Sequence, residues 1–570
     1  GGNVALSGAV NATTSGTERL TIVAGSAGAV SFGGAVGGTT PLGVTNVGGK
    51  TITLSGNLTT SNNADITLSG AVVLNATSTL SSANGDITLT GSVNGSSNGG
   101  QSLTVNAGTG DVLINADVGN LRALNSFSVS HSNDTTVSKS VKASTVSILS
   151  DDDTDAPSIT IADTASITAN TTLTMTKKNG VIDVSGRFYG TVTVTGENTT
   201  KNASTNTTTL KASSNSNFTI VGTDVSDRSK GTLTKTQPGK TATLTFSNIN
   251  ALDLAGGTSG NAFTLTEWFY DAAIDGAGGT DSVTVNRAQD ATSGLAFTLD
   301  STDGIKIVAP GGSFGAGTTS PLTIDYALTS IESASLAGGA GNDSFDIGGW
   351  SAKASVIGNA GLDELIWSAS ADSLLTPISF SAGTLVASLS SINSAQLENT
   401  GANSRFSISG FVGAVDITGV SSSTVTATYN SNFSLTGASD TVGTITTGNT
   451  TIDFTAGNVS LIGGVRDNVF TLDGTFTGVV TLDGGVGNDT YNITLPASTN
   501  TTNQVTVSDT GNTSRDTIIA RSITGTGLLS KTTTSAPNTP LVGYIVYIAG
   551  GTATSKPRIN FSGIEFFTLQ

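Results

Sequence analysis

Apolar and polar residues alternate along most of this chain in short runs. Four runs in the first hundred residues have nearly the same form, an apolar residue, Thr or Ala, Leu, Ser or Thr, and Gly, and they lie at 4–8, 52–56, 66–70 and 87–91. Because side chains alternate between the two faces of a strand, the two apolar residues of each run face one way and the residue between them faces the other. The closing glycine is typical of a turn. This pattern predicts an all-β fold, with room for only a helical turn or two at 121–130 and 361–375.

Glycine-rich loops in the second half of the chain come in pairs. The loop at Gly256-Gly257 is followed by one at Gly276, and pairs of the same kind begin at Gly338 and Gly358 and at Gly463 and Gly484. Within each pair the two loops lie 20 or 21 residues apart. Such a period is typical of a repeat whose coils stack on one another. We therefore predict a right-handed parallel β-solenoid (β-helix) with about 20 residues per coil, taking the handedness from the general rule for parallel crossovers.

Composition changes along the chain and suggests three regions. Residues 1–131 are predicted to form an N-terminal β-solenoid, and residues 241–570 a C-terminal β-solenoid that carries Gly-Gly-x-Gly-x-Asp loops. Residues 132–240 contain more Lys and Arg and long Asn, Thr and Ser tracts. This middle region is either an irregular part of the solenoid or an inserted β-sandwich domain.

Charge and cysteine content narrow the classes of function. The formal net charge is −17, and the chain has no cysteine among its 570 residues. An acidic surface disfavours nucleic acid, because phosphate binding needs clustered Lys and Arg. The lack of cysteine excludes disulfides, thiolate metal sites and thiol catalysis. No apolar run is long enough to predict a membrane-spanning helix. The first residues do not read as a signal peptide, so we expect either a removed targeting segment or a piece of a longer chain.

Two nine-residue segments fit a Gly-Gly-x-Gly-x-Asp-x-apolar-x pattern, at 338–346 and 484–492. Calcium takes six or more oxygen ligands, and a tight turn stacked on a second one offers carbonyl and carboxylate oxygens together. The candidate calcium ligands are the acidic or amide residues of the paired loops, with Asp343 over Asp363 as the best pair. The full set is Asp343, Asp363, Asp489, Asp467, Asp281 and Asn261. The alternative is that glycine shapes these turns while Asn and Asp bind the local backbone.

These segments resemble the calcium-binding RTX repeats of secreted bacterial proteins. The stretch Ile331-Glu332-Ser333-Ala334-Ser335-Leu336 before Gly338 is similar to a linkage found in very large bacterial surface proteins of that kind. Two stretches of the first third, 39–42 and 123–129, are similar to filamentous-haemagglutinin-like adhesin repeats. The resemblance covers about 300 residues in scattered pieces. It implies secretion, a parallel β-helix, and adhesion or assembly outside the cell.

Catalysis is not expected. His131, the only histidine, has no companion acid or nucleophile in its sequence neighbourhood, so we predict a solvent-facing strand residue rather than a catalytic one. Asp151, Asp152 and Asp153 are adjacent in sequence, and we interpret them as a solvated turn. The three tryptophans favour packing at coil corners over a sugar-binding surface.

The two ends of the chain read as halves of one repeat. The segment 559–570 matches the first half of the unit seen at 249–255 and 331–337, and Gly1-Gly2 matches the glycines that follow it there. We therefore expect either a cut from a longer tandem protein or protomers that stack head to tail.

The sequence thus predicts a secreted bacterial structural protein that forms a cell-surface or extracellular fibre, sheath or layer. Its main partner is another copy of itself, with glycans or a host or neighbouring cell surface as further partners. An adhesin stalk within a larger surface protein is the alternative, and a polysaccharide-active enzyme is a third.

Overall fold

The computed structural model describes residues 1–61, 63–152, 156–197, 207–223, 227–289, 294–310, 322–473, 476, 478–495, 504–511, 515–522, 528–533, 541–548 and 558–570. These residues divide into two compact units. Unit 1 consists of Gly1–Asn286 and Ile324–Glu332, and unit 2 of Arg287–Thr323 and Ser333–Gln570. Each unit is described by itself.

The fold is all-β, as the alternating pattern predicts. Every regular element among the described residues is a strand, and the strands lie in long, mostly parallel sheets. The two segments with room for helical turns are not helical. β12 (Leu124–His131) covers most of the first, while β34 (Glu364–Ser368) and β35 (Ser373–Thr376) occupy the second. The apolar residues of both segments follow the two-residue period of a strand, which explains why they form strands rather than helical turns.

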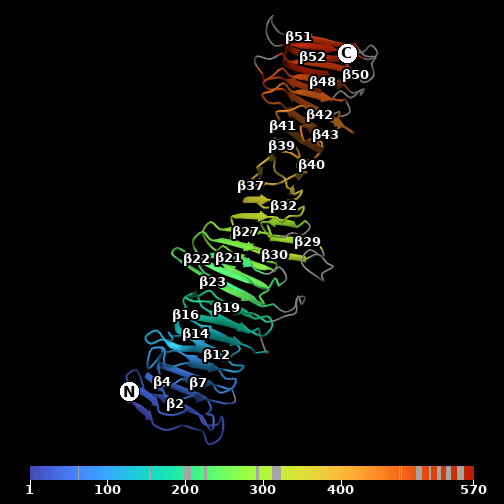
Figure 1. The fold of residues 1–570 in the computed structure, drawn as a ribbon. Helices are drawn as coiled ribbons and strands as arrows, with labels where there is room; N and C mark the ends of the chain where they lie inside the picture. Colours follow the sequence, from blue (N-terminus) through green and yellow to red (C-terminus); the bar gives the residue numbers. More distant parts are fainter. Residues whose placement is uncertain are drawn as a thin grey trace. The chain divides into compact units, whose positions relative to one another are not determined.

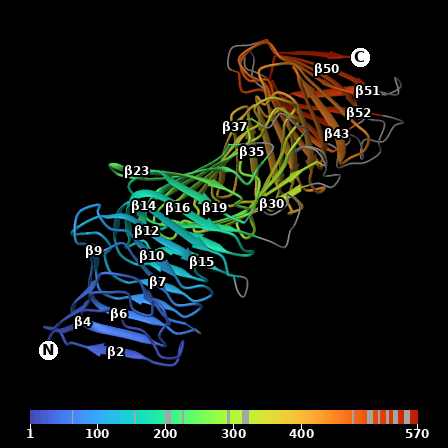
Figure 2. The same cartoon turned by 60° about the horizontal axis from the view of Figure 1, so that its bottom comes forward.

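Many strands of unit 1 pair in parallel with a strand about 20 to 26 residues farther along the chain. β4 (Thr45–Leu54) pairs with β6 (Ile66–Leu74) in parallel, with Thr45 opposite Ile66, and the two lie side by side in Figure 2. β24 (Ala251–Ala255) pairs with β26 (Ala272–Asp275), with Leu252 opposite Ala272, twenty residues on. The spacing of the Gly256 and Gly276 loops therefore equals the spacing of the strands beside them.

Unit 2 repeats this arrangement. β31 (Ser333–Ala337) pairs with β33 (Lys353–Ile357), and β32 (Ser344–Gly349) pairs with β34, both in parallel and both with an offset of twenty residues. β45 (Asn458–Ile462) pairs with β47 (Val479–Asp483) at twenty-one. β39 (Arg405–Ser409) pairs in parallel with β41 (Thr424–Thr428) at nineteen, and the two lie side by side in Figure 1.

Antiparallel insertions interrupt the parallel ladders at intervals. In unit 1, β21 (Asn217–Gly222), β22 (Gly231–Gln237) and β23 (Lys240–Ser247) form a three-stranded meander. Its outer strands pair in parallel with the ladder, β23 with β19 (Val192–Thr195) and β21 with β25 (Ala262–Thr266). Three such meanders lie in the described part of unit 2. They are β35, β36 (Ser379–Ala382) and β37 (Leu385–Ser390); β42 (Phe433–Gly437), β43 (Val442–Thr447) and β44 (Thr450–Thr455); and β51 (Leu528–Thr533), β52 (Leu541–Ile548) and β53 (Arg558–Ile564).

The middle region, 132–240, contains part of the first meander. The described strands on either side of it, β12 and β24, pair in parallel with β14 (Val141–Ser150) and β20 (Thr209–Ser213), which lie inside it. The three-region division itself stays a prediction.

The core consists of inward-facing side chains stacked from strand to strand. Along β6, Ile66, Leu68, Gly70, Val72 and Leu74 are buried, and the residues that alternate with them are more exposed. Parallel pairing in register places the inward-facing apolar side chains of one strand directly above those of the next, which builds apolar ladders. Each fully buried aliphatic or aromatic side chain stabilises the fold by roughly 1.5–3 kcal/mol.

Aromatic residues form one such ladder in unit 2. The rings of Phe433, Phe470 and Tyr491 are stacked with centroids 5.0 and 5.1 Å apart. Trp268 in unit 1 and Trp350 and Trp367 in unit 2 are buried, in agreement with the packing interpretation of the tryptophans.

Candidate functional site

Acidic and amide residues form ladders at the point where parallel strands begin. In unit 2, Asp343 precedes β32, Asp363 precedes β34 and Asn393 precedes β38 (Ser394–Glu398). The backbone N–H of Asp343 donates to Oδ1 of Asp363 at 2.8 Å, and the N–H of Asp363 donates to Oδ1 of Asn393 at 2.9 Å. Each side chain thus binds the backbone of the preceding level. We call this set the 343 ladder.

The same arrangement occurs in unit 1, as the 261 ladder. The N–H of Asn261 donates to Oδ1 of Asp281 at 2.6 Å, and the N–H of Asp281 donates to Oε2 of Glu332 at 2.6 Å. Glutamate ends this ladder, and the segment between Asp281 and Glu332 is far longer than one coil.

A third set, the 468 ladder, contains four levels in unit 2. Asn468 donates its N–H to Oδ1 of Asp489 at 2.6 Å, Asp489 to Oδ1 of Asp516 at 2.8 Å, and Asp516 to Oε2 of Glu565 at 2.9 Å. Asp489, Asp516 and Glu565 directly precede β48 (Thr490–Leu495), β50 (Thr517–Ser522) and β54 (Phe566–Leu569), which pair in parallel.

The paired glycines of the sequence motif leave room for these side chains and hydrogen-bond to them. The N–H of Gly339, the second glycine, donates to Oδ2 of Asp343 at 2.7 Å. A Cβ on the first glycine, Gly338, would lie 2.1 Å from that same oxygen, so only glycine leaves room. The loops at Gly256 and Gly463 repeat both features with Asn261 and Asn468.

The second loop of each pair is built differently. Its second residue has a left-handed backbone, with φ of 63° at Ala277, 69° at Asn359 and 82° at Gly485. The N–H groups of Ala277 and Gly485 donate to aspartates two residues earlier instead of to the ladder side chain. As a result one oxygen of the ladder carboxyl, Oδ2, has no hydrogen-bond partner. This holds for Asp281, Asp363 and Asp489, whose side chains are buried.

Burial without a partner disfavours the charged form of these carboxyls. It raises the pKa of Asp281 and of Asp363, although the hydrogen bonds from the preceding level oppose the shift. Burial likewise raises the pKa of Asp489 to about 6, and the neighbouring carboxylates of Asp516, Asp467 and Asp483 add to this effect.

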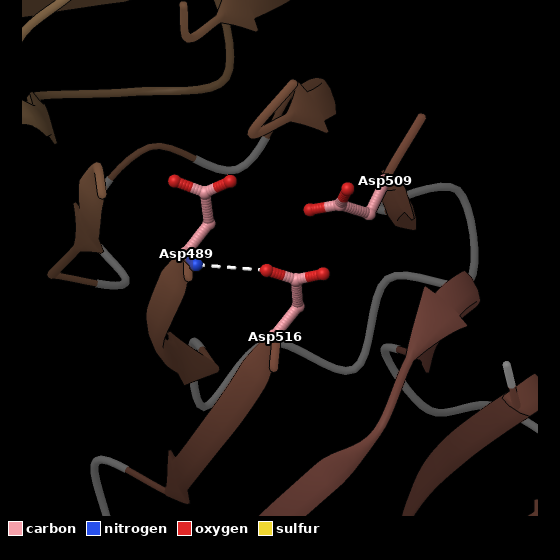
Figure 3. A group of neighbouring side chains, drawn as sticks. All are labelled: Asp489, Asp509 and Asp516. Carbon is pink, nitrogen blue, oxygen red and sulfur yellow. Dashed lines mark hydrogen bonds between the residues drawn. The ribbon is translucent and has the colours of Figure 1, made fainter. Parts of the chain in front are cut away.

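Asp489 also belongs to a compact acidic group (Figure 3). Asp489, Asp509 and Asp516 are all buried, and each offers a carboxylate oxygen within 4.8 Å of the others. Asp509 follows β49 (Gln504–Ser508) and its carboxyl points toward the other two. We call this group the aspartate triad.

Tyr491 supports one member of the triad. Its hydroxyl donates to Oδ2 of Asp509 at 2.5 Å and accepts the N–H of Gly484 at 2.7 Å. Oδ1 of Asp509 accepts the N–H of Gly511 at 2.9 Å. Burial raises the pKa of Asp509 to about 6, with Asp516 and Asp489 adding to the shift. Burial and the bond to Asp509 also raise the pKa of Tyr491, which keeps this phenol protonated.

The structure brings most of the predicted ligands together as neighbours in ladders. Asp343 lies next to Asp363, and Asn261 next to Asp281. Asp467 is displaced by one position: its Oδ1 accepts the N–H of Asn488 at 2.8 Å, while Asn468 is the residue level with Asp489. Only Asp489 of the six predicted ligands belongs to a close acidic cluster in the described part of the chain. Calcium binding by the paired loops stays a prediction.

Sequence reasoning missed Asp509 and Asp516, which lie in Ser508-Asp509-Thr510 and Arg515-Asp516-Thr517, outside any glycine motif. The sequence does contain a pattern that marks the last residue of each ladder: isoleucine directly precedes Glu332, Asn393 and Glu565. His131 lies at the end of β12 with its side chain half exposed, as expected for a solvent-facing strand residue. Its Nδ1 lies 2.7 Å from a carboxylate oxygen of Asp151, a contact that its sequence neighbourhood does not indicate. Of the three adjacent aspartates, Asp153 lies outside the described residues.

Comparison with protein-family models, with curated proteins and with solved structures gives no match. Among the described residues no helix has the length and apolar character needed to cross a membrane.

Proposed function

We propose that this chain is a right-handed parallel β-solenoid that serves as a secreted structural protein and assembles head to tail into an extracellular fibre, sheath or layer. The observation that carries the proposal is the repeated parallel register within each unit, where a strand is followed after about one coil by the strand that pairs with it. Repeated stacking of this kind builds an elongated scaffold from nearest-neighbour contacts.

The distribution of side chains supports a scaffold role. Inward positions carry Val, Ile, Leu and Phe, and the positions between them are mainly Thr, Ser and Asn, as along β41 (Thr424–Thr428) and β45. Such outward residues hydrate the surface with little charge. The proposed role is mechanical and needs no catalytic group.

Backbone pairing supports assembly. A parallel ladder grows when another strand adds to its edge, and the hydrogen bonds that join levels within a unit are of the kind that would join two copies. A head-to-tail contact of this type does not close on itself, so it produces an open filament.

Negative-stain electron microscopy of the purified protein over a range of concentrations tests this proposal. We expect filaments or sheets with a regular repeat that form without any other component. Single particles at every concentration, together with a monomer mass by light scattering, would contradict assembly and leave a spacer segment as the remaining structural role.

A further inference from the structure

The aspartate triad differs from the rest of the ladders because it gathers three buried carboxyl groups in one place. Asp489 and Asp516 are fully buried and Asp509 nearly so, and one carboxylate oxygen of each lies within 4.8 Å of those of the other two. Every charged group that shifts the pKa of Asp489 or Asp509 is another carboxylate. Three buried negative charges at this separation repel strongly in a medium of low dielectric constant. A positive charge from outside the chain would offset that repulsion.

One oxygen of the triad is available for a ligand. Oδ2 of Asp489 is buried and has no hydrogen-bond partner, whereas its Oδ1 accepts the N–H of Asn468 at 2.6 Å. Buried polar atoms are nearly always paired, so an unpaired carboxylate oxygen beside two other carboxyls points to a missing cation.

Glycine at position 484 leaves room for this oxygen beside the hydroxyl of Tyr491. A Cβ on Gly484 would lie 2.3 Å from Oδ2 of Asp489 and 2.5 Å from the hydroxyl oxygen of Tyr491. Glycine therefore preserves the space next to both oxygens. Asp509 is held in place from two sides, by Tyr491 and by the N–H of Gly511. Fixed oxygens around a small space are a typical environment for a hard cation.

We propose that the aspartate triad binds a divalent cation through carboxylate oxygens of Asp489, Asp509 and Asp516, with calcium as the expected ion. All three ligands are oxygens, which favours calcium over metals that prefer nitrogen or sulfur. The site links β48, β49 and β50, so the bound ion would stabilise successive levels of unit 2. It differs from the predicted paired-loop sites, because two of its three ligands lie outside the glycine motifs. It does not depend on the proposed scaffold function.

Terbium luminescence provides a direct test, because Tb³⁺ replaces calcium and is excited through a nearby tyrosine. Tyr491 hydrogen-bonds to a proposed ligand, so we expect emission on excitation of the protein and loss of that emission when calcium is added. Tyr491→Phe should remove most of the emission while calorimetry still detects calcium binding. Tyr429→Phe is the matched control, because Tyr429 is also buried in unit 2 but donates to the carbonyl of Phe411. It should leave the emission unchanged.

Substitution of the ligands tests the assignment to these residues. Asp489→Asn and Asp516→Asn should weaken calcium binding at least about tenfold, measured by calorimetry on metal-stripped protein. Asparagine keeps the ladder acceptor, as Asn393 shows in the 343 ladder, where its Oδ1 accepts the N–H of Asp363. Asp363→Asn, the equivalent change in the 343 ladder, should leave the tightest calcium site unchanged.

Two results would overturn the proposal. One is a wild-type protein whose melting temperature and calorimetric signal do not respond to calcium at neutral pH, which would mean that protons alone balance the triad. The other is terbium emission that persists undiminished in both Tyr491→Phe and Asp516→Asn, which would place the ion elsewhere. If a ligand variant does not fold, the wild-type titration and the tyrosine pair still decide the question.

Discussion

A single unpaired carboxylate oxygen is expected to make the protein sensitive to pH. Burial raises the pKa of Asp363 above its ordinary value of 3.8, so the folded state holds this proton more tightly than the unfolded chain. The contribution of Asp363 to stability is therefore fully present below 3.8 and is lost as the pH rises through the raised pKa. Above that range the ionised carboxylate destabilises the fold.

Asp363→Asn should consequently stabilise the protein at pH 7.5 by about 1 kcal/mol. The amide keeps the oxygen that accepts the N–H of Asp343 and carries no charge. The gain should disappear near pH 3.5, where the wild-type carboxyl is protonated. Denaturant unfolding at both pH values measures the difference, with the exposed Asp416→Asn as control. Destabilisation by Asp363→Asn at pH 7.5 that disappears near pH 3.5 would contradict this prediction and show that the fold needs the charged form.

The buried Lys235 is expected to stabilise the fold through its hydrogen bonds to the backbone. Nζ of Lys235 donates to the carbonyl oxygens of Val184, Ser185 and Gly186 at 2.5, 3.0 and 2.6 Å. Lys235→Met would leave three carbonyl groups without this donor, so we expect a loss of about 2–4 kcal/mol in the free energy of unfolding. Lys240→Met, an exposed change in the neighbouring strand, should cost less than about 0.5 kcal/mol. Equal losses would show that the bonds of Lys235 contribute little.

At the scale of the element, one loop contains two glycines with different requirements. A Cβ at Gly276 would lie 2.1 Å from the carbonyl oxygen of Ser330 and 2.6 Å from Cβ of Asp281, whereas a Cβ at Gly278 meets nothing closer than 3.8 Å. Gly276→Ala should therefore lower stability by about 2–4 kcal/mol, and Gly278→Ala should be neutral or slightly stabilising. Thermal unfolding of the two variants compares them directly. Similar melting temperatures would mean that the ladder side chain moves aside easily.

The sequence predicts the strands and their pairing where the interval between repeats is regular, and fails where a segment is inserted. Alternation of apolar residues predicts the strands, and the interval between Gly338 and Gly358 predicts their register, because strands paired without an insertion between them keep the same offset. The meanders lengthen the interval between paired strands, so a fixed period does not predict their register. Glu364, for example, pairs with Ser394, thirty residues on, in the same parallel geometry. The same limit applies to the site. Asp509 and Asp516 meet Asp489 only through parallel pairing of distant strands, which no local motif records.

At the scale of each unit, stability depends on contacts between successive levels. Three features join one level to the next: backbone pairing, inward stacks such as Phe433, Phe470 and Tyr491, and the ladders of acidic and amide side chains. All three are interactions between nearest neighbours. A unit of this kind resembles a one-dimensional array more than a globular core, so local damage should stay local.

Phe470→Ala tests this consequence within unit 2. Phe470 lies in β46 (Val469–Leu472) between β42 and β48, and its removal from the stack should cost about 3–5 kcal/mol. In a nearest-neighbour array that cost opens the damaged level and its neighbours, because the strands farther along retain all of their own contacts. Amide hydrogen exchange should therefore rise in β42, β46 and β48 and remain at the wild-type rate in β31 to β34. If exchange rose equally in both sets, unit 2 would unfold as one cooperative block, and the stacked levels could not be treated as independent.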